Sequence, residues 1–205
     1  MDKGKLIVLE GIDGAGTTTQ AGKLAEALRA RKIVVATTCE PSDGPVGKLI
    51  RGYLKGEHKL DAQLRGPGLA LLFAADRLDH LAREVNPWLE RGKVVISDRY
   101  LLSSLAYQSL DCELKWVMEI NREAPPPDLT ILLDLPAETA LKRVSERALW
   151  PELFEKADLQ KRVRENYLKL ARELFSDQKI LVLDSTQPIK TLGQRILKEV
   201  LAYLG

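Results

Sequence analysis

Apolar residues are grouped along the chain in short, unbroken runs rather than in strict alternation with polar residues. Runs of this kind are typical of strands that are buried on both faces of a parallel sheet. We expect such strands at residues 6–9, 33–38, 94–97, 129–135 and 180–183.

The segments between these runs carry apolar residues at helical spacing. In the longest of them, Leu71, Leu72, Ala75, Leu78 and Leu81 follow the pattern of an amphipathic helix. We expect helices at residues 20–31, 67–91, 159–174 and 192–204. Strands that alternate with helices predict an α/β fold, a three-layer sandwich around a five-stranded parallel sheet.

The bulk composition excludes some classes of protein. The 205 residues suit one domain, residues 1–205, and 31 Lys and Arg against 29 Asp and Glu leave a net charge of +2. Nucleic-acid binders usually carry a larger basic surplus, so we expect no nucleic-acid partner. Cys39 and Cys112 form no metal-binding pattern, and no stretch reaches the roughly 18 apolar residues of a membrane span. We therefore expect a reduced, cytoplasmic protein with no membrane partner.

A glycine-rich loop follows the first predicted strand. Gly11 and Gly16 have the spacing of the Walker A pattern G-x-x-x-x-G-K-[ST], and Thr18 fills its hydroxyl position. Backbone N–H groups of such a loop bind phosphate, although a plain glycine turn is the alternative. The predicted phosphate-binding positions are Gly11, Asp13, Gly14, Ala15, Gly16, Thr17, Thr18 and Thr19.

The residue at position 17 departs from this pattern, because Thr17 stands where the lysine should be. That lysine places a positive charge on the outer phosphates of a nucleotide. Removing one preorganised donor from a developing anion typically costs about 3–4 kcal/mol. The sequence therefore leaves open a protein that binds nucleotides with weakened or absent catalysis.

A second chemical signal follows the third predicted strand, which runs into Asp98 and Arg99. An acid at this place is typical of a Walker B site, so we expect Thr18 and Asp98 to hold Mg²⁺, directly or through water. Arg99 would offer two parallel donors to a phosphate. The alternative is an Asp that caps the next helix.

Several separated blocks together resemble the thymidylate kinase family. They are Leu-Glu-Gly-Ile-Asp-Gly-Ala-Gly at 9–16, Thr-Cys-Glu-Pro at 38–41 with 47–51, Leu-Phe-Ala-Ala-Asp-Arg at 72–77, and Asp-Arg-Tyr at 98–100 with 103–108. Arg-Glu-Asn-Tyr at 164–167 fits the helix after the family's lid. The resemblance implies a P-loop nucleoside monophosphate kinase fold and an ATP-dependent phosphorylation of dTMP to dTDP, with Mg²⁺.

The resemblance also implies an acceptor site. Asp13 would accept a hydrogen bond from the 3′-hydroxyl, Phe73 would stack on thymine, and Arg77 would donate to a thymine carbonyl. Arg51 and Arg99 would bind the monophosphate. The full set implied for dTMP is Asp13, Glu40, Arg51, Phe73, Arg77, Arg99, Ser104, Tyr107 and Gln108.

The catalytic and lid residues are likewise implied by the resemblance. The catalytic set is Arg99, Glu40, Arg147 and Asp98. A lid at about residues 143–157 would place Arg143 and Arg147 on the ATP side, and Arg147 would partly replace the missing loop charge. Family members are typically homodimers, and the apolar helix at 67–82 is a plausible contact face.

Other functions stay open at this point. One is a kinase for another monophosphate such as dUMP; a second is a non-catalytic nucleotide-binding homologue, which Thr17 supports. A nucleic-acid-linked NTPase fits the near-neutral charge poorly.

Overall fold

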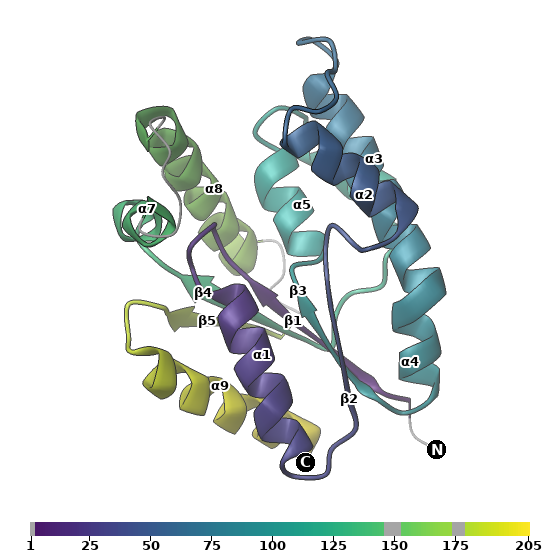
Figure 1. The fold of residues 1–205 in the computed structure, drawn as a ribbon, viewed down its shortest axis with the longest axis vertical. Coiled ribbons are helices and arrows are strands. Elements are labelled where there is room, and N and C mark those ends of the chain that lie inside the picture. The colour runs from purple at the N-terminus through teal and green to yellow at the C-terminus, as the bar shows by residue number, and fades with distance from the viewer. Residues whose placement is uncertain (1–2, 146–152, 174–178) are drawn as a thin grey trace.

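The computed structural model describes residues 3–145, 153–173 and 179–205, with the backbone alone at 153–156. Its centre is a five-stranded sheet in the order β2-β3-β1-β4-β5, and every neighbouring pair of strands is parallel (Figure 1). The strands are β1 (Lys5–Glu10), β2 (Val35–Cys39), β3 (Val94–Asp98), β4 (Leu129–Asp134) and β5 (Ile180–Asp184). The predicted α/β fold and its parallel sheet are confirmed.

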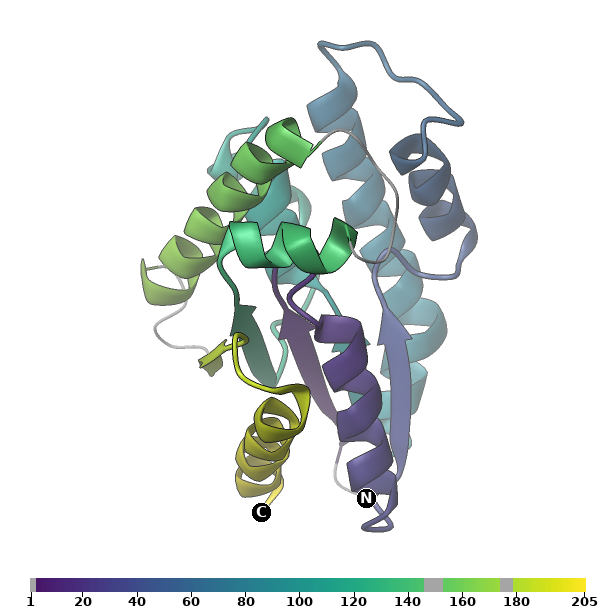
Figure 2. The same cartoon turned by 60° about the vertical axis from the view of Figure 1, so that its left-hand side comes forward.

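Helices cover both faces of this sheet. α1 and α9 lie side by side on one face, where they pack against Ile7 and Leu9 of β1 (Figures 1 and 2). Leu6 and Val8 point to the other face, against Leu81. The helical elements are α1 (Thr17–Arg29), α2 (Pro45–Leu54), α3 (Arg65–His80), the π-helical turn η1 (Leu81–Val85), α4 (Asn86–Glu90), α5 (Leu101–Gln108), α6 (Leu114–Ile120), α7 (Ala137–Ser145), α8 (Leu153–Glu173) and α9 (Ile189–Leu204).

The long helix predicted at 67–91 is divided in the structure. α3 passes into η1 and then α4, with Pro87 in the first turn of α4. Proline has no N–H to donate to the preceding turn, so a regular α-helical ladder cannot continue through it. Four helices that periodicity did not predict are short: α2, α5, α6 and α7.

The carboxyl ends of the central strands come together at one edge of the sheet. Leu9 is in register with Asp98, so the glycine loop after β1 lies beside the acid that ends β3. Parallel α/β sheets bind ligands at this edge. In the described part of the chain, no helix is long and apolar enough to cross a membrane.

Candidate nucleotide-binding site

The glycine-rich loop joins β1 to α1 and requires glycine at two positions. Gly14 has a φ of 88° and Gly16 a φ of 94°, both in the left-handed region that glycine adopts without strain. A Cβ on Gly14 would lie only 2.5 Å from the carbonyl oxygen of Ala140 in α7. The loop thus leads directly into the N-terminus of α1, where backbone N–H groups and the helix dipole favour an anion.

Thr17 is the first residue of α1, and its side chain is buried. Thr18, the next residue, donates a hydrogen bond from its hydroxyl to Asp98 Oδ2. The other carboxylate oxygen, Asp98 Oδ1, is buried and has no hydrogen-bond partner among the described residues. A hydroxyl beside a carboxylate is a hard-oxygen pair that suits Mg²⁺, an ion that usually takes its remaining ligands from water and phosphate.

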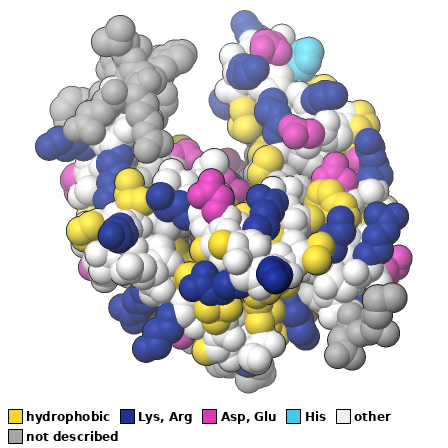
Figure 3. All heavy atoms as spheres, turned by 60° about the horizontal axis from the view of Figure 1, so that its bottom comes forward, with side chains coloured by type: hydrophobic (Ala, Val, Ile, Leu, Met, Phe, Trp, Pro, Cys, Tyr) yellow, Lys and Arg dark blue, Asp and Glu magenta, His cyan; other side chains and the backbone are white. Residues whose placement is uncertain are grey.

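A cavity of about 360 Å³ opens beside this loop, between the α2–α3 part of the molecule and α5 and α8. Figure 3 shows a deep notch in the surface of the molecule. A cavity of this size accommodates a small ligand. The structure brings into its lining all but one of the predicted acceptor residues, namely Asp13, Glu40, Phe73, Arg77, Arg99, Ser104, Tyr107 and Gln108.

Arg77 reaches the cavity from α3 and is only 1% exposed. Its Nη2 donates to Glu40 Oε2 at 2.7 Å and to Ser104 Oγ at 2.9 Å, and its Nη1 donates to Asn121. Its Nε has no hydrogen-bond partner among the described residues. Protein groups therefore fix the guanidinium, and its Nε–H is a donor left for a molecule in the cavity.

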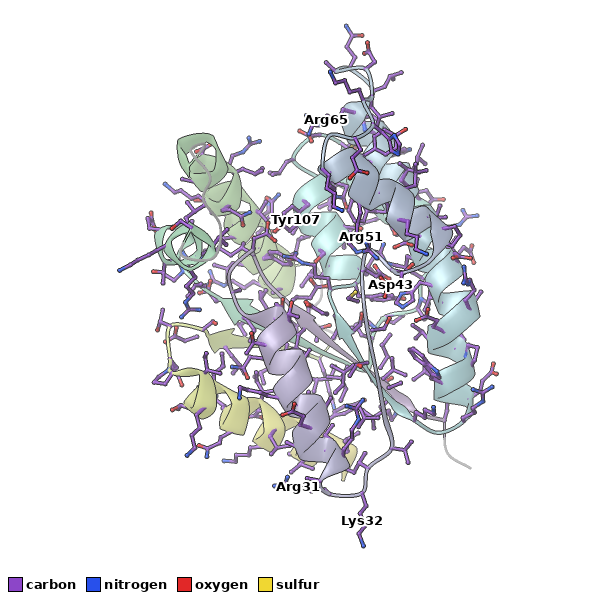
Figure 4. All side chains as sticks on the ribbon, in the orientation of Figure 1. Arg31, Lys32, Asp43, Arg51, Arg65 and Tyr107 are labelled. Carbon is purple, nitrogen blue, oxygen red and sulfur yellow. The ribbon has the colours of Figure 1, made fainter. Side chains whose placement is uncertain are left out.

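Gln108 and Tyr107 lie on α5 at the same cavity. Gln108 Oε1 is buried without a hydrogen-bond partner in the described part of the chain, so it is an acceptor open to a ligand. Burial raises the pKa of Tyr107 to about 12, although the Arg99 cation acts in the opposite direction. In Figure 4 Tyr107 lies between α5 and α8, and its ring meets that of Tyr167 edge-on at 6.2 Å.

Arg99 lies at the end of the cavity nearest the glycine loop. Its backbone has a φ of 73°, unusual for a residue with a side chain. Its Nη2 donates to Asp13 Oδ1 at 2.7 Å, and its Nη1 donates to Ser103 Oγ at 3.2 Å and to the Tyr167 hydroxyl at 3.4 Å. The guanidinium is thus held at the wall where the glycine loop and α5 meet.

Beneath Arg99 lies a carboxylate that sequence reasoning did not select as a site residue. Glu10 accepts hydrogen bonds from the Ser103 hydroxyl at 2.5 Å, the Tyr167 hydroxyl at 3.1 Å and the Tyr100 backbone N–H at 2.9 Å. Burial raises the pKa of Glu10, against the lowering effect of the Ser103 hydrogen bond. Glu10 and Tyr167 stand inside the blocks that carry the family resemblance, and that is the signal that could have identified them.

Gln160 on α8 is a second functional candidate that the sequence did not reveal. Its Nε2 donates to Asp13 Oδ2 at 3.1 Å, and its Oε1 accepts from the Asp13 backbone N–H at 3.2 Å. Both contacts join residues 147 positions apart, so no local motif could indicate them.

Arg51 is the predicted acceptor residue that does not line the cavity. Its guanidinium donates to the carbonyl oxygens of Pro41 at 2.5 Å and Ser42 at 2.6 Å, and to Asp43 Oδ1 at 2.6 Å. Figure 4 shows Arg51 on α2 beside Asp43. Pro41 lines the cavity, so Arg51 contacts a residue of the cavity wall without lining the cavity itself.

The predicted lid is described only in part. Arg143, on α7, donates to the Ser185 carbonyl oxygen at 3.0 Å, and the Ser185 hydroxyl donates to the Ala15 carbonyl oxygen at 2.6 Å. Arg143 is therefore connected to the glycine loop through one residue. Arg147 lies outside the described residues.

A family profile and three known proteins that are similar to this chain carry one family name. A family profile described as thymidylate kinase matches residues 9–196. A Thermococcus kodakarensis protein named "Probable thymidylate kinase" is 45% identical over 204 residues, covering 97% of this chain and 98% of the relative. A Pyrococcus horikoshii protein of the same name is 47% identical over 181 residues, covering 87% and 88%. One from Methanosphaera stadtmanae is 42% identical over 201 residues, covering 97% and 98%.

Proposed function

The chain belongs to the thymidylate kinase family, and from this premise we propose how its described residues phosphorylate dTMP. As a member it is a phosphotransferase that uses ATP and acts on dTMP, a function that holds over the alternatives of a different monophosphate or a purely binding role. The observation that carries the site assignment is the cavity, where predicted base-binding, sugar-binding and phosphate-binding residues meet beside the glycine loop.

We propose that thymine occupies the end of the cavity between Phe73 and Arg77. The Phe73 ring would stack on the base, and Arg77 Nε would donate to a thymine carbonyl, since its Nη atoms already have protein partners. Gln108 Oε1 can accept from the N–H of a pyrimidine ring. Ser104 contributes to this end by receiving a hydrogen bond from Arg77.

The acceptor phosphate would lie at the Arg99 end. Arg99 and Asp13 are paired at 2.7 Å, so a bound nucleotide would face a cation for its phosphate and a carboxylate for its 3′-hydroxyl at adjoining positions. Arg51 would reach the phosphate from behind Pro41, and Tyr107 would pack against the sugar. Glu40 would act through its ion pair with Arg77.

The donor phosphates would bind to the amides of residues 11–19 at the N-terminus of α1. Thr18 and Asp98 are the residues that would hold Mg²⁺, which when bound neutralises charge on the donor phosphates. No protein group forms a covalent bond, so the work of this chain is to position two phosphates and exclude water.

We further propose a single domain, a lid at about 143–157 that carries Arg143 and Arg147, and a homodimer. The dimer is supported by a strip of exposed apolar side chains on α3, formed by Leu71, Ala75 and Leu78, of which Leu71 is 51% and Leu78 42% exposed. Both cysteines are free thiols, which suits a cytoplasmic location.

The assignment is tested by measuring ADP release from Mg·ATP with dTMP, dUMP, dCMP, dGMP and UMP as acceptors. We expect turnover with dTMP well above that with each other acceptor. Equal turnover with a purine monophosphate would contradict the base-binding role of Phe73, Arg77 and Gln108, and ADP release without any acceptor would indicate a simple ATPase.

A further inference from the structure

A buried histidine lies directly behind the base-binding end of the cavity. His80 ends α3, three residues after Arg77, and its side chain is 1% exposed. It does not line the cavity, and the proposed reaction gives it no role. Its surroundings connect it to Arg77 through a single carboxylate.

That carboxylate is Glu40, which is also buried and is the ion-pair partner of Arg77 within the described residues. A buried arginine depends on such a partner, and the partner must itself be held in one orientation. Arg77 satisfies Oε2 of Glu40 at 2.7 Å. The other oxygen, Oε1, meets His80 Nδ1 at 3.4 Å and has no other hydrogen-bond partner in the described part of the chain.

The imidazole is fixed from its opposite side. Its Nε2 lies 2.6 Å from the hydroxyl of Thr38 on β2 and 3.7 Å from the Glu84 carboxylate. Glu84 belongs to η1, the π-helical turn that begins directly after His80. Turns of this kind are rare and often occur near functional sites. The two ring nitrogens of His80 therefore have different tasks: Nε2 anchors the ring, and Nδ1 faces Glu40.

We propose that His80 is a positioning residue for acceptor binding, which holds the Glu40 carboxylate, and through it the Arg77 guanidinium, in the orientation that the base requires. This inference rests on the proposed acceptor site. A residue that acts through Glu40 and Arg77 affects the binding of dTMP and leaves the ATP side unchanged, because neither residue belongs to the glycine loop.

Two amide variants separate the tasks of the two nitrogens. In His80→Asn the amide nitrogen falls close to the position of Nδ1, so the contact with Glu40 is kept and the anchor on Thr38 is lost. In His80→Gln the amide falls close to the position of Nε2, so the anchor is kept and the contact with Glu40 is lost. Both are neutral polar residues in the same buried place, which makes each the matched control for the other.

Steady-state kinetics of the wild type and both variants, with thermal unfolding measured on the same samples, tests the inference. We expect His80→Gln to raise the KM for dTMP about tenfold with the KM for ATP unchanged, and His80→Asn to stay within about threefold of wild type for both. Equal KM values for dTMP in the two folded variants would overturn the positioning role, whatever their melting temperatures. If wild type itself failed to turn over dTMP, the proposed function would fall instead.

Discussion

Restoring the lysine of the phosphate loop tests how this chain manages without it. Thr17 is the first residue of α1, the end of the helix at which free backbone N–H groups favour an anion. Arginines on neighbouring elements are already engaged, Arg99 by Asp13 and Arg164 by Asp134. A Thr17→Lys variant would therefore add a charge that the described loop does not otherwise contain.

The expected increase in kcat follows from the free energy that one preorganised charge contributes to the transition state. A donor directed at developing negative charge contributes about 3–4 kcal/mol, which corresponds to roughly 10²–10³ in kcat. We expect Thr17→Lys to raise kcat at least tenfold. If no other cation of the chain takes the lysine's place, the increase should reach roughly 10²–10³. The KM for dTMP should not change, because Thr17 does not line the acceptor cavity.

The assay is ADP release with saturating dTMP and Mg·ATP. Thr17→Met introduces an uncharged side chain close to lysine in length, so it separates the effect of the added charge from that of the added size. Arg147→Ala, made in wild type and in Thr17→Lys, tests whether Arg147 substitutes for the lysine: it should slow the wild type and spare the lysine variant. A gain below threefold in Thr17→Lys, together with no loss in Arg147→Ala, would refute the view that a loop charge is missing.

Three further predictions concern the cavity and the surface. Phe73→Ala should raise the KM for dTMP about 5- to 160-fold at constant KM for ATP, because a base stacked on an aromatic ring gains about 1–3 kcal/mol; an unchanged KM would remove Phe73 from the base site. Tyr107 has a folded pKa of about 12 against an ordinary 10, so its contribution to stability is complete below pH 10 and is lost as the pH rises toward 12. The free energy of unfolding should therefore fall between pH 9 and 11 by about 1 kcal/mol less in Tyr107→Phe than in wild type, as measured by urea titration; parallel curves would contradict this. Leu78→Glu should convert a dimer to a monomer in sedimentation. Val34→Glu, at an apolar residue directly before β2 that is more exposed than Leu78 (63% against 42%), should not. If the Leu78→Glu variant remained a dimer, the α3 strip would be excluded as the interface.

The strands are the elements that the sequence predicted best, because each was located from a continuous apolar run and differs from its prediction by at most two residues at an end. β1, β3 and β4 are almost wholly buried, as such runs indicate, whereas the edge strands β2 and β5 are partly exposed. α2 and α5 escaped prediction because helices of 10 and 8 residues offer too few turns for a period to emerge. α2 also contains Gly47 and Gly52, which weaken a helix signal.

The site divides in the same way between local and long-range features. The glycine loop and the acid that ends β3 could be predicted because each is a contiguous motif, and the register of Leu9 with Asp98 brings the two motifs together without any further signal. The partners that orient them come from distant parts of the chain. Gln160 on Asp13 is one case, and His80 behind Glu40 is another.

Arg51 shows why a motif predicts the identity of a residue better than its contacts. Its place in a family block implied a phosphate ligand, yet its guanidinium is held by the carbonyl oxygens of Pro41 and Ser42. Those bonds depend on how the loop after β2 folds back on α2, which local sequence does not specify. Among the described residues, three of the five N–H groups of the guanidinium are engaged in this way, which leaves Nε–H and one Nη1–H as donors for a phosphate. An acceptor phosphate bound there would share one arginine with the Pro41 wall of the cavity.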